Sequence, residues 1–409
     1  MEYNKTEFLD VYRECNRNIK RFSELKKLNA PEFAGFQYEI KCNAALMVIK
    51  NSMEDALTGI RKEIKTTAEL CFLIRNIDVS IEYVLSLNNV LFETGLNKQN
   101  KAVKICFEHP EVVKEFRKLR SFVLAHPINT SYTDDNGNET TAYIEDVLPK
   151  RNLDSLFGLS EEHDFALRMT IPSGSKDSTE SKSGYIGLKI DTDIVPMMEE
   201  IKIGLSMISK KAKDKIDEIE KTLKETPLVL DRSSKERYII SLDKELQKRY
   251  PSEVEDTLYD DGTKYHWSII YNCLAYYSAK FKNETQKRYD IFLQYITKEL
   301  RRIENDLQSM TYSEEDNDYF NLFYNNEFAK NKGYEKEKVG YLKESDNTSY
   351  TKDIISDATK SDILWGIQAF NCLIPDIEQY IPIDTDVPDK WLYCEYIAAN
   401  YLSNEKVKE

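Results

Sequence analysis

The chain has 409 residues, 41% of them hydrophobic and 31% charged, which is the composition of a globular protein and excludes a disordered one. With about 150 residues in a typical domain, this length predicts two or three packed units. The net charge of −14 argues against a protein that coats nucleic acid nonspecifically, because affinity for a phosphate backbone comes largely from cationic side chains. Any contact with nucleic acid therefore requires a local basic patch.

The cysteines and the N-terminus indicate a cytoplasmic protein. Even the closest two of the seven cysteines, Cys372 and Cys394, are too far apart for the CxxC spacing of a zinc site. The first residues contain no apolar segment of the kind found in signal peptides, and no run of about 18 apolar residues occurs. We expect reduced thiols in helix cores, no membrane contact, no cofactor and no metal.

Residues 1–132 are predicted to form a bundle of four or five helices. Apolar residues at helical spacing place helices over 36–64, 68–74, 81–90 and 109–126. The last of these should begin at His109-Pro110, because proline fits the first helical turn, and should end at His126, because Pro127 follows.

Residues 133–195 are predicted to form a β-containing insertion. The turn-forming sequence Asp-Asp-Asn-Gly-Asn occupies 134–138, and the segments 165–171 and 185–190 alternate apolar and polar residues as strands do. The polar segment 172–184 between them is expected to be a mobile loop. A plain surface excursion and an arm for dimerisation or substrate contact both fit this pattern.

The rest of the chain is predicted to be helical, with a long-helix region over 196–312 and a C-terminal helical region over 313–409. Helical spacing of apolar residues indicates helices over 201–223, 278–310, 362–370 and 391–397. The turn Asp260-Asp261-Gly262 is expected to separate the second of these from a preceding helix pair. The predicted fold class is therefore mostly all-α, with a small β insertion.

One chemically specific motif stands out, the sequence Arg120-Ser121-Phe-Val-Leu-Ala-His126. The buried stripe of its helix is predicted to consist of Val112, Phe116, Leu119 and Val123. In an ideal helix Arg120 and His126 lie about 120° apart around the axis and about 9 Å apart along it. One helix cannot close both groups around a single phosphodiester, whereas a symmetric pair of helices could bring Arg120 of one chain near His126 of the other.

This motif resembles the Arg–polar–x(3–5)–His motif of HEPN domains, and the resemblance is confined to about the first 130 residues. In that family the motif lies near the end of a helical bundle of this size. The resemblance implies a metal-independent endoribonuclease that acts as a homodimer, in the manner of toxins and phage-defence effectors. Ser121 stands where the family often has Asn, Asp or His, so the resemblance gives it at most an auxiliary role.

The chemistry of RNA cleavage suits the two residue types of the motif. Without a metal, the 2′-OH attacks the adjacent phosphorus while a group of near-neutral pKa, here His126, transfers protons. Arg120 can grip the phosphate through two hydrogen bonds and offset the charge that builds on its oxygens. The expected products carry a 2′,3′-cyclic phosphate and a 5′-OH.

A local basic patch accompanies the motif. From Lys98 to Arg120 the chain has seven Lys or Arg and three Glu, against the acidic balance of the whole. Lys114, Arg117 and Lys118 are the predicted RNA-binding residues, because a cluster of cations on one helix is what guides a phosphate backbone. The predicted partners are an RNA substrate, a second copy of this chain across the motif helix, and a neutralising or activating protein.

Three alternatives remain open, one of which is an unrelated helical protein whose residues 1–130 form no independent bundle. Arg120 could pair with Glu115 or another acid while His126 caps the end of its helix, where the dipole favours a cation. A non-catalytic HEPN-like scaffold or binding subunit of a defence or toxin–antitoxin complex would also share the bundle without needing a phosphate-gripping pair.

The other histidines point to no chemistry. His109 is expected to flank the start of the motif helix, His163 to lie in a solvated acidic loop, and His266 to be a packed helix residue. No P-loop, GxGxxG, GxSxG or EF-hand spacing occurs, which argues against a nucleotide hydrolase, a Rossmann enzyme, an α/β-hydrolase and a calcium site.

Overall fold

The structure, a computed structural model, describes residues 5–29, 35–61, 64–92, 99–124, 130–133, 139–150, 163–172, 181–258, 264–281, 283–324, 327–344 and 360–407. The chain divides into two compact units, Met1–Asp217 (unit 1) and Glu218–Glu409 (unit 2). The described residues are mostly helical with only small antiparallel sheets, which confirms the predicted fold class. The unit boundary falls within the predicted long-helix region 196–312.

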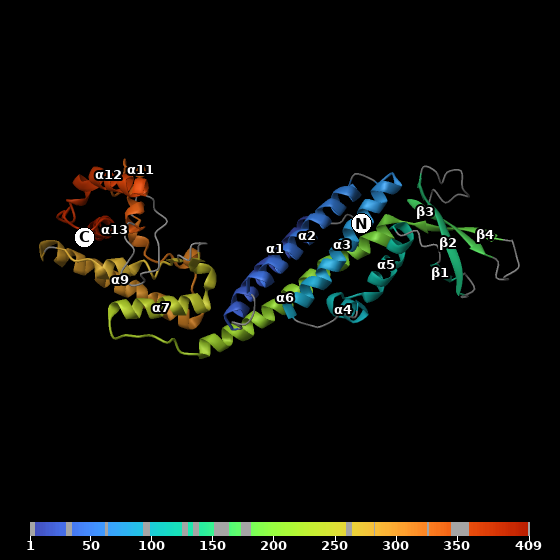
Figure 1. The fold of residues 1–409 in the computed structure, drawn as a ribbon, viewed down its shortest axis with the longest axis horizontal. Coiled ribbons are helices and arrows are strands. Elements are labelled where there is room, and N and C mark those ends of the chain that lie inside the picture. The colour runs from blue at the N-terminus through green and yellow to red at the C-terminus, as the bar shows by residue number, and fades with distance from the viewer. Residues whose placement is uncertain are drawn as a thin grey trace. The chain divides into compact units, whose positions relative to one another are not determined.

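Long helices form the body of unit 1 (Figure 1). They are α1 (Lys5–Asn29), α2 (Gly35–Arg61), α3 (Thr67–Phe92) and the first part of α6 (Val195–Glu225), with the shorter α4 (Gln99–Cys106) and α5 (Pro110–Leu124) beside them. In α6 the predicted apolar stripe is buried from Ile201 through Ile216. The Asn18 amide on α1 donates to the Ser209 hydroxyl on α6 (2.9 Å), which joins the first helix of the unit to the last.

Helix α3 is continuous where two helices were predicted, over 68–74 and 81–90. The linking residues include Ile77 and Ser80, both fully buried. The Ser80 hydroxyl donates to the Asn76 carbonyl (2.9 Å), so this polar side chain satisfies itself within the helix and does not interrupt it. The single long helix matters for the site because its middle turns face α5.

The predicted β insertion forms a four-stranded antiparallel sheet at one end of unit 1 (Figure 1). Its strands, in spatial order, are β1 (Thr130–Thr133), β2 (Glu139–Pro149), β3 (Phe165–Pro172) and β4 (Ser181–Leu188). The hairpin expected from 165–171 and 185–190 is confirmed, with Arg168 opposite Tyr185. The expected turn at 134–138 lies outside the described residues, as does most of the expected loop at 172–184.

The sheet is fastened to the helices at two points. The Thr67 hydroxyl at the start of α3 donates to the Val147 carbonyl on β2 (2.8 Å). The Asp164 carboxylate accepts from the backbone N–H of Ile190 (2.9 Å), at the start of the π-helical turn Ile190–Ile194 that leads into α6. On β3, Phe165 and Leu167 are buried.

Unit 2 consists of the end of α6 and a set of helices around an aromatic core. Its helices are α7 (Lys235–Arg249), α8 (Cys273–Ser278), α9 (Asn283–Ser309), α10 (Glu314–Asn317), α11 (Gly333–Val339), α12 (Lys360–Ile377) and α13 (Asp389–Val407). Tyr289 and Phe292 of α9 are fully buried, and the Phe292 ring lies 5.9 Å from that of Tyr401 on α13. The long helix predicted over 278–310 and the helices predicted at 362–370 and 391–397 are present as α9, α12 and α13.

The segment before α9 differs from the prediction. A short hairpin, β5 (Glu255–Leu258) and β6 (Lys264–Trp267), flanks the predicted turn, which itself lies outside the described residues. His266, expected in a helix, is on β6 opposite Asp256. Four-residue strands offer too few positions for alternation to be visible in the sequence, so the pattern could not reveal them.

A buried arginine joins α7 to the end of α6. Arg249 at the end of α7 is fully buried, and its two terminal nitrogens donate to the carbonyls of Leu223 (2.7 Å) and Thr226 (2.9 Å) at the end of α6. Its Nε donates to the Glu245 carboxylate (3.2 Å), which supplies the balancing charge. The Leu223 carbonyl also accepts from the Thr226 N–H (3.2 Å) and the Thr226 carbonyl from the Gln308 amide (3.3 Å), so Arg249 adds a second donor to each of them.

Candidate functional site

Two ion pairs fix α5, the helix of the predicted motif, against α3. The Arg120 Nε lies 3.0 Å from the Asp78 carboxylate, and an Arg117 terminal nitrogen lies 2.6 Å from that of Glu82. Asp78 and Glu82 are one turn apart on α3, and the order of their partners on α5 is reversed, so the two helices are antiparallel here. Each pair joins a side chain that is nearly half exposed to one that is partly enclosed, and ion pairs this open to water contribute about 0–1 kcal/mol each, so they set orientation more than stability.

The beginning of α5 is fixed by a buried acid of α6. Glu200, only 3% exposed, accepts from the backbone N–H of His109 through one oxygen (3.0 Å) and contacts the His109 ring Nδ1 through the other (2.5 Å). The hydrogen bond to Glu200 and the charge of that carboxylate raise the pKa of His109 above its ordinary value. His109 is at the start of α5 as predicted, and its ring contacts a carboxylate far away in sequence.

Arg120 keeps part of its guanidinium free. Asp78 engages only its Nε, no other partner occurs among the described residues, and the side chain is 44% exposed. Its two terminal nitrogens can therefore donate to a group arriving from solvent, while the carboxylate behind holds the side chain in place. Arg117 is more enclosed, with 22% of its side chain exposed.

Of the other predicted residues on the motif helix, some form an ion pair with a described residue and some do not. Lys118 contacts the Glu115 carboxylate at 2.9 Å, and Lys114 is exposed with no ion pair to a described residue. Ser121 is half-buried. His126 lies in 125–129, outside the described residues, so the structure positions Arg120 and leaves the arrangement of the Arg–His pair as a prediction.

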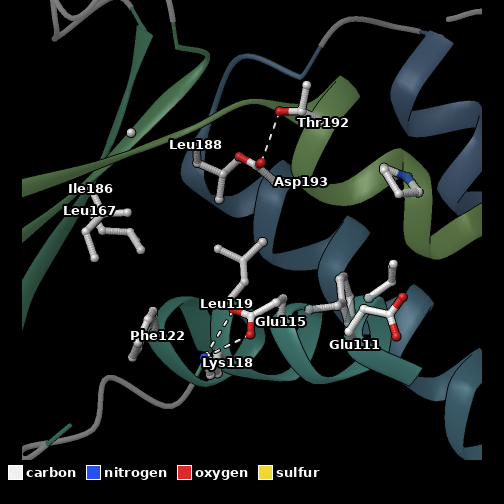
Figure 2. Close-up of a pocket in the computed structure, with 14 residues that line it drawn as sticks. Glu111, Glu115, Lys118, Leu119, Phe122, Leu167, Ile186, Leu188, Thr192 and Asp193 are labelled. Carbon is white, nitrogen blue, oxygen red and sulfur yellow. Dashed lines mark hydrogen bonds and ion pairs between the residues drawn. The ribbon is translucent and has the colours of Figure 1, made fainter. Parts of the chain in front are cut away.

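A cavity of about 510 Å³ lies between α5 and the sheet (Figure 2). Leu119 and Phe122 face it from α5, Leu167 and Ile186 face it from β3 and β4, and Asp193 borders it from the turn before α6. Lys118, bonded to Glu115, lines the cavity, and among the described residues no other member of the predicted site does. The walls are mainly apolar, which suits a flat apolar group with a polar edge, such as a nucleobase.

This cavity corrects the predicted buried stripe of α5. Val113, Phe116 and Val123 are buried, whereas Val112 and Leu119 are half-buried and line the cavity. The spacing of apolar residues identified the correct face of the helix. It could not distinguish residues that pack in the helical bundle from residues that line the cavity. The opposite wall comes from strands that lie some 50 to 70 positions later, and no signal in the helix announces it.

Two further histidines are packed rather than solvated. His163, expected in a solvated loop, lies against Gly187 on β4, where an added Cβ would be 2.1 Å from its ring. His266 lies between Asp243 (2.8 Å) and Asp256 (3.1 Å). Burial alone would lower the pKa of His266, but its bonds to the two carboxylates outweigh this effect and raise it. The Ser268 hydroxyl donates to Asp243 and not to His266, so this cluster lacks the serine–histidine bond that activates a nucleophile.

Comparisons with known proteins identify no relative. Among the described residues, no group of three or more His, Cys, Asp or Glu side chains could hold a metal ion, and no helix is both long and apolar enough to cross a lipid bilayer. A scan against family models, a search of curated proteins and a search of solved structures each find no match to this chain.

Proposed function

We propose that this protein is a metal-independent endoribonuclease of the HEPN type, a regulated toxin or phage-defence effector whose site is Arg120 and His126. The observation that carries the proposal is the state of Arg120. Its Nε is held by Asp78, its terminal nitrogens have no partner among the described residues, and its side chain is 44% exposed. An arginine whose Nε is bonded and whose terminal nitrogens remain available can bind a phosphate, because its donors need little reorganisation when the ligand arrives.

In this reaction the chain binds a phosphodiester and moves two protons. The 2′-oxygen of the ribose forms a bond to phosphorus as the P–O5′ bond breaks, which leaves a 2′,3′-cyclic phosphate and a 5′-OH. His126 transfers the protons between the 2′-OH and the leaving 5′-oxygen, and Arg120 donates to the phosphate oxygens. Lys114, Arg117 and Lys118 attract the backbone, and a second copy of the chain supplies the second motif.

The second candidate is a binding subunit without catalytic activity, and a specific observation favours it. Arg117, Lys118 and Arg120 each have a carboxylate partner, Glu82, Glu115 and Asp78 respectively. These pairs offset much of the positive charge that the sequence concentrates on α5. Under this reading Arg120 fastens two helices and does nothing else.

The first experiment compares RNA cleavage in EDTA by the native protein, Arg120→Ala, His126→Ala and Arg168→Ala. Arg168 is a matched control, since its Nε also lies 3.0 Å from a carboxylate, that of Glu145, and its side chain is 48% exposed. We expect the native protein and Arg168→Ala to leave cyclic phosphates, and the two motif variants to lose at least about 100-fold in rate. Equal cleavage by all four proteins would show that the activity comes from elsewhere.

A charge swap separates the two candidate functions. The double variant Asp78→Arg, Arg120→Asp rebuilds the ion pair between α3 and α5 with the charges exchanged. Its free energy of unfolding should therefore lie within about 1 kcal/mol of that of the native protein. A clamp for phosphate fails in this variant, since a carboxylate replaces the guanidinium. Growth arrest on expression is a second readout, and relief of that arrest by His126→Ala but not by Arg168→Ala supports the ribonuclease. Full activity of the swapped protein would rule out a catalytic Arg120.

A further inference from the structure

Unit 2 contains a basic cavity in an acidic chain. It has a volume of about 260 Å³ and lies between the start of α7 and the middle of α9. It is lined by Arg232, Ser234, Lys235, Tyr238, Thr297 and Arg301. Half of these residues are cations and none is a carboxylate, although acidic residues outnumber basic ones in the chain, 71 to 57. The cavity at α5, by contrast, has three carboxylates and a single lysine in its lining.

Arg232 is held in position from behind the cavity. One of its terminal nitrogens lies 2.6 Å from one Glu304 oxygen, and its guanidinium lies 5.2 Å from the centre of the Tyr238 ring. The Tyr238 hydroxyl donates to the other Glu304 oxygen (2.7 Å). Glu304 does not line the cavity, so it orients Arg232 and Tyr238 without placing negative charge inside.

Lys235 and Arg301 bring charges that nothing described neutralises. Both side chains are exposed, and neither forms an ion pair with a described residue. The Lys235 Nζ lies 5.9 Å from the centre of the Tyr277 ring, which gives only a weak attraction. Cations that share a cavity repel one another, and an anion between them removes that cost.

We propose that this cavity binds the phosphate group of a small phosphorylated molecule. With Arg232 paired to Glu304, Lys235 and Arg301 supply two uncompensated positive charges, which match the roughly two negative charges of a phosphate monoester, and arginine presents paired donors that fit its oxygens. At about 30 Å³ per water molecule, the cavity holds about eight or nine waters, which is room for a phosphate and a small organic body.

A small ligand fits this surface better than a nucleic-acid strand does. Glu304 adjoins the cavity, and Asp231 is the chain neighbour of Arg232, so a phosphodiester backbone that ran past the cavity would meet carboxylates. A single phosphate inserted between the three cations avoids them. The site lies in unit 2, and its argument is independent of the ribonuclease proposed for unit 1.

Calorimetric titration of the full chain with ribose 5-phosphate, at constant ionic strength, tests the proposal, with ribose as the uncharged control ligand. The cavity variant Lys235→Met, Arg301→Met should bind ribose 5-phosphate at least about tenfold more weakly than the native protein, because it loses two charged donors. The control variant Arg237→Met, Lys244→Met removes the same charge from exposed α7 residues outside the cavity and should bind within about twofold of the native protein.

A measurement on the native protein guards against misfolding of the variants. Ribose 5-phosphate should protect Lys235 from acylation, as read by mass spectrometry, and should leave Lys244 reactive. The proposal is overturned if ribose 5-phosphate binds no better than ribose, or if the control variant loses as much affinity as the cavity variant. It is also overturned if a short single-stranded RNA binds at these cations and ribose 5-phosphate does not compete with it.

Discussion

At the scale of single residues, Arg249 shows how a charge can be buried and still be satisfied. It is the largest fully buried side chain described, and it serves Glu245 and the carbonyls of Leu223 and Thr226 at once. A buried charge without such partners would be costly, so the arrangement must form as a whole. Loss of the Arg249 side chain should therefore lower the free energy of unfolding of unit 2 as a whole.

We expect Arg249→Met to lower the free energy of unfolding of unit 2 by about 3–5 kcal/mol, because the buried Glu245 loses its balancing charge and the Leu223 and Thr226 carbonyls each lose a donor. Lys248→Met is the control, since Lys248 lies 3.9 Å from the same Glu245 but is 41% exposed, and it should cost less than about 1 kcal/mol. Urea unfolding followed by tryptophan fluorescence measures both. Equal effects of the two variants would contradict this account of Arg249.

At the scale of elements, the close approach of α6 to the end of α4 depends on a glycine. A Cβ built on Gly204 would lie 2.9 Å from the Cys106 carbonyl oxygen and 3.2 Å from the Phe107 ring. Gly59 near the end of α2 has no atom within 4 Å of the same position. The two helical glycines differ in their surroundings, so the same substitution should have opposite effects.

Gly204→Ala is expected to destabilise unit 1 by about 1–3 kcal/mol, because α6 and α4 must move apart to admit the methyl group. Gly59→Ala should stabilise it by about 0.5–1 kcal/mol, because alanine loses less conformational entropy when the helix forms. Urea unfolding followed by far-ultraviolet circular dichroism gives both values. If Gly204→Ala does not lower the free energy of unfolding more than Gly59→Ala does, α6 and α4 do not pack as described.

The elements also show how far the sequence could predict this structure. Apolar spacing predicted α2, α5, α6 and α9 because each buries a regular stripe. It divided α3 between Ile74 and Ile81, where polar residues such as Ser80 interrupt the apolar pattern but not the helix, and it did not reveal β5 and β6. At the candidate site, the sequence singled out Arg120 but left open whether it pairs with an acid. It could not identify Asp78 as the partner, because Asp78 lies 42 positions earlier and the contact depends on how α3 packs on α5.

At the scale of the whole molecule, the two units can be observed separately. All three tryptophans, Trp267, Trp365 and Trp391, belong to unit 2. Tryptophan fluorescence therefore reports one unit, whereas circular dichroism reports the helices of both.

If the two units unfold independently, their urea midpoints need not agree, and we expect the fluorescence curve to have a single step that the circular dichroism curve does not follow. Arg249→Met should shift the fluorescence midpoint together with the part of the dichroism signal that follows it, and Gly204→Ala should shift only the part of the dichroism signal that fluorescence does not report. Superimposable curves for the native protein and both variants would mean that the chain unfolds as one cooperative body.

The way α5 is anchored has a consequence for the ancestry of the motif. Its arginine rests on Asp78 and its first turn rests on Glu200, which lie 42 positions before Arg120 and 91 positions after His109. Recombination that copied only the stretch around Arg120 and His126 into another gene would leave both supports behind. The transferred segment would keep the sequence of the motif but would lose the contacts that position its helix. Descent with this geometry requires that the long helices before and after the motif be inherited together with it.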